Sequence, residues 1–183
     1  MKLCIDAGHG GSDPGAVGPT GLEEAACNLK ICEDIEAGLE RLGLSVMCTR
    51  KNNANVSLGR RCQIANEWCA DYFVSIHCNS NGPSAYGVEV LYKTEKGKAL
   101  AAPIQEMLLE ATGDRDRGLV CRENLHVLNA TNMPACLAEV GFISHPDTET
   151  LLKSKEYLHI LAEAIVAGIA KFLQIKPSKP VKY

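Results

Sequence analysis

Short apolar segments alternate along the chain with segments whose apolar residues recur every three or four positions, and this alternation limits the fold most strongly. Residues 72–77 (YFVSIH) are rich in β-branched and aromatic residues, as is typical of a strand. Between residues 29 and 42 the apolar positions instead follow the helical period: Leu29, Cys32, Ile35, Leu39 and Leu42. Repeated alternation of strands and helices is typical of α/β domains with a mostly parallel sheet.

We therefore predict a single α/β domain over residues 1–173, with a mostly parallel, twisted sheet of about six strands and helices on both faces. Strands are expected at residues 3–7, 44–49, 72–77, 87–92, 125–128 and 135–140, and helices at 29–42, 57–69, 98–111 and 157–173. The capping-box pattern of Thr20 and Glu23 predicts the start of the first helix, and Pro103 predicts a start or a kink in the third. Residues 174–183, rich in Lys and Pro, are predicted to form a tail or linker.

The composition excludes several classes of protein. With 183 residues, 46% of them hydrophobic and 22% charged, the chain is long enough for one domain with a core. Its net charge of −3 gives no electrostatic reason to expect nucleic-acid binding, which favours basic faces. No apolar run approaches the roughly 18 residues that span a bilayer, so we expect no membrane span.

The nine cysteines contain no C-x-x-C pair, which argues against a structural zinc knuckle or a thioredoxin-like motif. Most of them lie within the apolar-periodic segments. We therefore expect reduced, mostly buried thiols and folding in a reducing compartment.

Reactive side chains occur where the predicted strands end. Parallel α/β sheets bind ligands beyond the carboxyl ends of their strands. His9 follows the first strand, His77 ends the central strand, and Glu139 lies in a late strand. Glu24 lies in the first turn of the helix after the Gly-rich loop. The sequence thus predicts two histidines and two carboxylates at one edge of the sheet.

Two histidines and one carboxylate are a common catalytic zinc set that leaves a fourth position open for water. A further carboxylate beside the metal can take the proton of that water and later protonate a leaving group. Such a set suits hydrolysis of an unreactive amide. Structural alternatives exist: Glu24 can complement the helix dipole, and we assign His126, His145 and His159 to structural or surface positions.

Two other chemistries are less well supported. Residues 8–13 (GHGGSD) nearly match the dinucleotide-binding pattern, but Asp13 replaces its third glycine. Cys78 adjoins His77, but no serine has the G-x-S-x-G surroundings of a nucleophile elbow. We therefore favour metal-assisted hydrolysis over dinucleotide binding and over covalent catalysis.

In these motifs the chain resembles the zinc-dependent N-acetylmuramoyl-L-alanine amidases of the Amidase_3 family. The resemblance covers the chain up to about residue 173. It depends on the order and spacing of DAGHGG (6–11), GLEE (21–24) followed by Asn28, Arg61 before AN (65–66), SIHCN (75–79), GVEV (87–90) and LAEVGFIS (137–144). Two departures are Cys78 in place of a usual alanine and His145 in place of a common asparagine.

The resemblance implies hydrolysis of the amide bond between N-acetylmuramic acid and L-alanine in peptidoglycan, with Zn²⁺ as the cofactor. It implies His9, Glu24 and His77 as zinc ligands and Glu139 as the catalytic acid/base. Glu23 competes with Glu24 for the ligand role. Glu24 is chosen because the acid of the family precedes an asparagine by four positions, as Glu24 does here.

Two further functions stay open beside the amidase: a zinc peptidase acting within the stem peptide, and a catalytically inactive wall-binding module. Asp6 lies too early for a secretory apolar region, so no export signal is predicted. The size and the Lys/Pro-rich tail resemble the catalytic domain of a phage endolysin released from the host cytoplasm; a secreted autolysin domain is the alternative. We expect a monomer whose partner is peptidoglycan.

Overall fold

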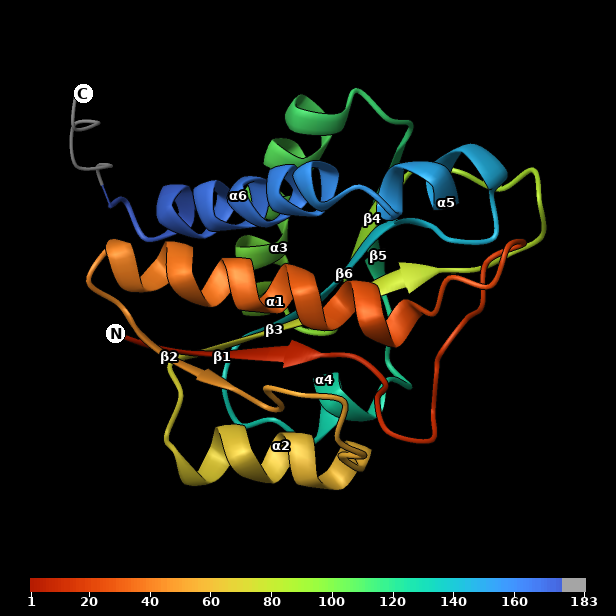
Figure 1. Ribbon diagram of the computed structural model, residues 1–183. Coiled ribbons are helices and arrows are strands. Elements are labelled where there is room, and N and C mark those ends of the chain that lie inside the picture. Colours follow the sequence, from red (N-terminus) through yellow and green to blue (C-terminus); the bar gives the residue numbers. More distant parts are fainter. Residues whose placement is uncertain (176–183) are drawn as a thin grey trace.

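In the computed structural model, which describes residues 1–175, a six-stranded sheet lies between two layers of helices (Figure 1). The predicted tail at residues 174–183 falls largely outside the described residues. The strand order across the sheet is β2-β1-β3-β6-β4-β5. The strands are β1 (Lys2–Ala7), β2 (Ser45–Cys48), β3 (Tyr72–Asn79), β4 (Val88–Tyr92), β5 (Asp116–Cys121) and β6 (Ala135–Phe142).

Most neighbouring strands are parallel. β1 pairs in parallel with β2 and β3, β3 pairs in parallel with β6, and β4 pairs in parallel with β5. The pairing of β4 with β6 is antiparallel. The predicted mostly parallel α/β sheet is therefore confirmed, and the carboxyl ends of β1, β3 and β6 meet at one edge.

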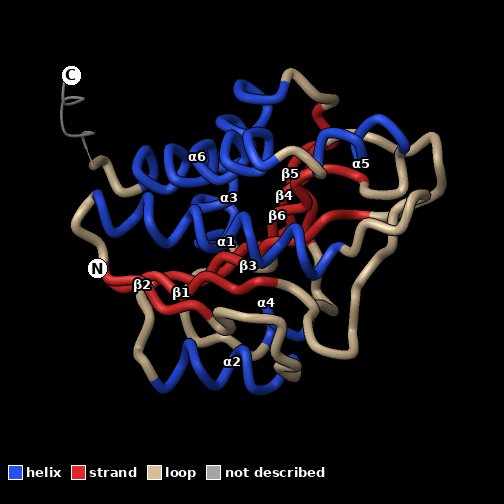
Figure 2. The backbone as a smooth tube through the Cα atoms, in the orientation of Figure 1, coloured by secondary structure: helices blue, strands red, loops and turns tan. Residues whose placement is uncertain are grey.

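Helices cover both faces of the sheet, as predicted (Figure 2). One face carries α1 (Glu24–Arg41), α3 (Glu95–Thr112) and α6 (Lys155–Phe172), and the larger hydrophobic core lies beneath them. The opposite face carries α2 (Leu58–Glu67) and α4 (His126–Asn129) over a smaller core. A short helix, α5 (Pro146–Leu152), follows β6.

One predicted strand is wrong and one strand was missed. Residues 125–128, predicted as a strand, enter helix α4, where Val127 and Leu128 are buried in the smaller core. A short apolar run fits a strand and a buried helical turn equally well, so packing decides between them. β5 was missed because it is a partly exposed edge strand that begins with the polar sequence DRG.

The structure corrects the predicted cap of α1 and excludes one of the two predicted roles of Pro103. Thr20 does not cap α1; the helix begins at Glu24 after Glu23, and neither residue supplies a side-chain cap. Thr20 instead turns its backbone N–H toward Glu149 on α5. Pro103 does not start α3, which begins at Glu95 behind the capping hydroxyl of Thr94. The helix continues through Pro103 because Ala101 and Ile104 beside it are buried and α3 packs on the sheet and on α6.

All nine cysteines are free thiols, and seven of them are buried, as predicted. Only Cys69 and Cys121 are exposed. Within residues 1–175, every helix is too short or too polar to cross a lipid bilayer.

The packing of α6 on α3 gives a first prediction. A Cβ at Gly168 would lie 2.6 Å from the Cα atom of Ile104 and 2.8 Å from the carbonyl oxygen of Pro103. We expect Gly168→Ala to lower the free energy of unfolding by about 1–2 kcal/mol, because overpacking against backbone outweighs the gain in helix propensity. Urea unfolding measures this change. Gly59→Ala in α2 is the matched control, since nothing lies within 4 Å of its Cβ position, and it should leave stability equal or higher.

Candidate active site

His9 lies in the loop after β1, in a backbone conformation that is uncommon for residues other than glycine. Its φ is 59°, in the left-handed region. Two glycines make room for the imidazoles around it. A Cβ at Gly15 would come within 2.8 Å of the His9 ring, and a Cβ at Gly8 would fall on the imidazole of His77. The Gly-rich loop is therefore required for close approach of the two histidines.

Glu24 is the first residue of α1, and only 4% of its surface is exposed. Its carboxylate accepts hydrogen bonds from the backbone N–H groups of Ala16 (2.9 Å) and Cys78 (3.0 Å). The side chain of Asn28, one turn along the helix, donates to the same carboxylate at 3.2 Å. The adjacent Glu23 is exposed. The structure thus places Glu24, rather than Glu23, inside the site.

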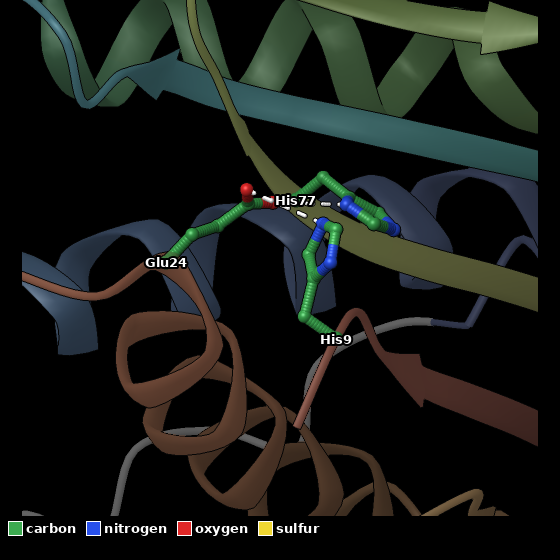
Figure 3. A group of neighbouring side chains, drawn as sticks. All are labelled: His9, Glu24 and His77. Atoms are coloured by element: carbon green, nitrogen blue, oxygen red, sulfur yellow. Dashed lines mark hydrogen bonds and ion pairs between the residues drawn. The ribbon is translucent and has the colours of Figure 1, made fainter. Parts of the chain in front are cut away.

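The three predicted ligand residues converge (Figure 3). Glu24 Oε2 lies 3.3 Å from His9 Nε2, and Glu24 Oε1 lies 2.9 Å from His77 Nδ1. One ligand atom from each residue lies within 4.8 Å of the others. Two imidazole nitrogens and one carboxylate oxygen at this spacing fit a divalent cation, and the donor types suit zinc.

The charges of this cluster are strongly coupled. The hydrogen bond between His9 and Glu24 raises the pKa of His9 to about 9. Burial alone would raise the pKa of Glu24, but its contacts with His77 and His9 hold that pKa well below the ordinary value. In this arrangement Glu24 is a carboxylate, and the negative charge is stabilised by the surrounding donors.

Asp13 fixes the orientation of the His9 ring. Its carboxylate lies 2.8 Å from His9 Nδ1, while Nε2 faces Glu24. A carboxylate that accepts from one imidazole nitrogen leaves the other nitrogen free to act as a metal ligand. Asp13 was noted in the sequence only as a departure from a dinucleotide-binding pattern, so this contact was missed.

Glu139 lies on β6 directly opposite His77 of β3 in the strand register. Burial raises the pKa of Glu139 to about 7. Its Oε2 atom is buried and has no hydrogen-bond partner among the described residues. A buried carboxylate oxygen without a partner is costly, and such groups concentrate at functional sites.

A pocket of about 360 Å³ opens beside His9 and His77. Its opposite wall includes His126 at the start of α4, with neighbouring apolar residues of that segment. His126 is exposed, as is His159, whose ring lies 3.3 Å from Asp34. His145 precedes α5 and contacts the ring of Tyr86. The cluster of His9, Glu24 and His77 includes none of these three histidines.

Two buried arginines hold the loop that carries His9. Arg61 donates to the carbonyl oxygens of Ala7 (2.5 Å) and His9 (2.7 Å), and to the buried Asp6 carboxylate at 2.7 Å. Arg50 donates to the carbonyl oxygens of Ala7 at 2.9 Å and Gly8 at 2.8 Å. Arg50 was missed because it follows a short strand and belongs to no recognisable motif.

A second anchor holds the loop that leads into Glu24. Glu149 of α5 is almost fully buried and accepts hydrogen bonds from the backbone N–H groups of Thr20 and Leu22. Lys153, one turn later, donates to the hydroxyl of Thr20. Thr20 and Glu149 are 129 positions apart in the sequence, and no local pattern signals their contact.

Known proteins share the sequence pattern and the fold of this chain. Residues 3–171 match the family model described as N-acetylmuramoyl-L-alanine amidase. The chain is 36% identical over 181 residues to the sporulation-specific N-acetylmuramoyl-L-alanine amidase of Bacillus subtilis (strain 168), covering 96% of this chain and 69% of that protein. The structure is similar to the catalytic domain of CwlV, an N-acetylmuramoyl-L-alanine amidase from Bacillus (Paenibacillus) polymyxa var. colistinus. The TM-score is 0.91 and the identity 36%, and the match covers 96% of this chain and 99% of that one. It is also similar to the N-acetylmuramoyl-L-alanine amidase AmiC2 of Nostoc punctiforme, with a TM-score of 0.91 and 38% identity. That match covers 95% of this chain and 97% of AmiC2.

The buried pair of Arg61 and Asp6 gives a stability prediction. Their side chains are 4% and 1% exposed, so removing the cation leaves an unpaired buried carboxylate. We expect Arg61→Gln to lower the free energy of unfolding by about 3–5 kcal/mol. Arg60→Gln is the matched control on the same helix, because Arg60 forms an exposed ion pair with Glu67 and should change stability by less than about 1 kcal/mol. Equal effects of the two changes in urea unfolding would contradict the proposed anchoring role of Arg61.

Proposed function

This chain belongs to the N-acetylmuramoyl-L-alanine amidase family, and from this we propose that it hydrolyses the amide bond between N-acetylmuramic acid and L-alanine in peptidoglycan. We propose that His9, Glu24 and His77 hold a zinc ion and that Glu139 is the general acid/base. The observation that carries the proposal is the cluster of three ligand atoms within 4.8 Å of one another, next to a buried carboxylate oxygen without a partner.

The donor set supports zinc in particular. Three protein ligands of the types His, His and Glu leave a coordination position open, which is the pattern of catalytic zinc sites. When bound, zinc supplies Lewis acidity, because it polarises a carbonyl group and lowers the pKa of water to roughly 7. The contact of Asp13 with His9 Nδ1 and the hydrogen bonds to Glu24 orient two of the ligands in advance.

Glu139 performs the proton transfers of the proposed reaction. Its carboxylate accepts a proton from the attacking water as the new C–O bond forms. The same carboxyl group donates that proton to the alanine nitrogen as the C–N bond breaks, which regenerates the carboxylate. A pKa close to neutrality suits both transfers, although a cation held nearby lowers the pKa of Glu139 again by favouring the carboxylate.

The biological setting of the reaction stays a prediction of the sequence. This applies to the phage-endolysin interpretation, the autolysin interpretation and the monomeric state. The zinc-peptidase alternative differs from the amidase in its products. An amidase releases stem peptides with a free N-terminal alanine and leaves the muramic acid intact.

Replacing Glu139 tests the acid/base role. We expect Glu139→Gln to lower the rate of wall hydrolysis by about 10²–10⁴-fold, because the amide side chain cannot accept the proton. The zinc content should stay equal to that of the unmodified protein. The release of free N-terminal alanine from purified cell walls measures the rate. Elemental analysis measures the zinc content. Near-normal turnover of Glu139→Gln would refute the assignment.

Replacing His77 tests the ligand set. His77→Ala should lose both bound zinc and activity, because only two of the three ligands remain. A strong chelator should abolish activity of the unmodified protein, and added zinc should restore it. His159→Ala is the control, since this histidine is exposed and lies outside the cluster. Stoichiometric zinc in purified His77→Ala would show that the ligands are assigned wrongly.

A further inference from the structure

A row of polar side chains crosses the sheet at the edge that carries the candidate active site. His77 on β3 lies opposite Glu139 on β6, and Glu139 lies opposite Glu89 on β4. The next strand, β5, supplies Arg117 beside Glu89. The row therefore leads from the proposed metal ligands, past the acid/base, to a cation two strands beyond Glu139.

Arg117 is held in place on two sides. Its Nε atom donates to Glu89 Oε2 at 3.3 Å, and Asn79 at the end of β3 donates to Glu89 Oε1 at 2.8 Å. Its guanidinium carbon lies 4.7 Å from the centroid of the Phe142 ring. An ion pair and a cation–π contact together fix the plane of the guanidinium group.

The backbone just before β4 makes room for this side chain. Gly87 has a φ of 116°, and a Cβ there would lie 2.9 Å from the Cγ atom of Arg117. The contact with Glu89 uses Nε, and the Nη1 contact with the carbonyl oxygen of Tyr86 is long at 3.5 Å. Within residues 1–175, Nη2 has no recorded hydrogen-bond partner, and the Arg117 side chain is 29% exposed.

The other arginines near the site are arranged differently. Arg50 and Arg61 are buried, and backbone carbonyls occupy most of their donors. Their role is to hold the loop. Arg117 is oriented by protein contacts, but it is partly exposed and some of its N–H groups are not used within the described part of the protein. That is the form of a preorganised carboxylate receptor.

We propose that Arg117 binds a carboxylate in the peptide part of the substrate. The inference rests on the proposed function, because it takes the substrate to be a muramoyl peptide. N-acetylated sugars are neutral, and the lactyl carboxyl group is consumed in the amide bond. The carboxylates of such a substrate therefore belong to the peptide, and Arg117 places the peptide over β4 and β5.

The spacing identifies which carboxylate is within reach. Neighbouring strands are about 4.8 Å apart, and Arg117 leans toward Glu89, so its guanidinium lies roughly 5–10 Å from Glu139. An extended peptide advances about 3.5 Å per residue. A carboxylate on the second residue after the cleaved bond fits this distance. Arg117 thus distinguishes an acidic second residue from its amidated form.

A simpler role for Arg117 is to neutralise Glu89 beside Glu139. That role would affect every substrate equally, whereas a receptor role depends on the charge of the peptide. The two are separated by a pair of synthetic disaccharide tripeptides with amidated C-termini. The second residue of both compounds is a glutamate joined to the third residue through its γ-carboxyl group, so that its α-carboxyl group is free in one compound and amidated in the other.

With the unmodified, zinc-loaded protein, we expect kcat/KM for the free acid to exceed that for the amide by about 10–100-fold. Arg117→Gln should reduce this ratio to about 1, and Arg117→Lys should retain part of it. Arg115→Gln is the matched control on the same segment, because Arg115 lies over the Tyr86 ring, and it should keep the full ratio.

The outcomes separate this inference from the proposed function. Equal losses on both substrates with an unchanged ratio in Arg117→Gln would overturn the receptor role while leaving the amidase intact. Equal kcat/KM values for the free acid and the amide in the unmodified protein would overturn the receptor role as well. Absence of cleavage of both compounds and of whole cell walls would instead overturn the proposed function itself.

Discussion

The arrangement of the site depends on the buried carboxylate of Glu24. This single group contacts the loop after β1, the end of β3 and both histidines. Its position at the start of α1 adds the favourable field of a helix N-terminus. Because burial of an unpaired carboxylate is costly, the loop and strand must stay in place to supply its donors. Glu24 thereby joins segments that are distant in sequence into one rigid cluster.

The surrounding polar network maintains this rigidity. Asp6 accepts hydrogen bonds from Thr49, Ser75 and Arg61, and all of these side chains are buried. Arg50 and Arg61 satisfy carbonyl groups of the His9 loop that no strand or helix can reach. A fully satisfied buried network specifies one loop conformation. The loop that carries His9 is therefore held in place by contacts within the protein itself.

Because β4 runs antiparallel to β6, residues of a different kind lie next to Glu139 at this edge. Were all strands parallel, the edge beyond β6 would again present carboxyl-terminal residues. Instead β4 and β5 run in the opposite direction. Residues near their starts bring Glu89 opposite Glu139 and Arg117 beside Glu89. The edge therefore changes from the cluster of His9 after β1, Glu24 at the start of α1 and His77 on β3 to an ion pair between β4 and β5.

The sequence by itself determined the α/β class, the mostly parallel sheet and the grouping of His9, Glu24, His77 and Glu139. Apolar periodicity is a local property, and the carboxyl ends of parallel strands meet at one edge wherever they lie in the chain. Only the tertiary structure decided that residues 125–128 are helical, that β5 exists at the edge and that Thr20 binds Glu149 instead of capping α1. The Asn79–Glu89–Arg117 contacts were also decided there. In each case the deciding energy comes from packing or hydrogen bonds between segments far apart in sequence, which local patterns do not encode.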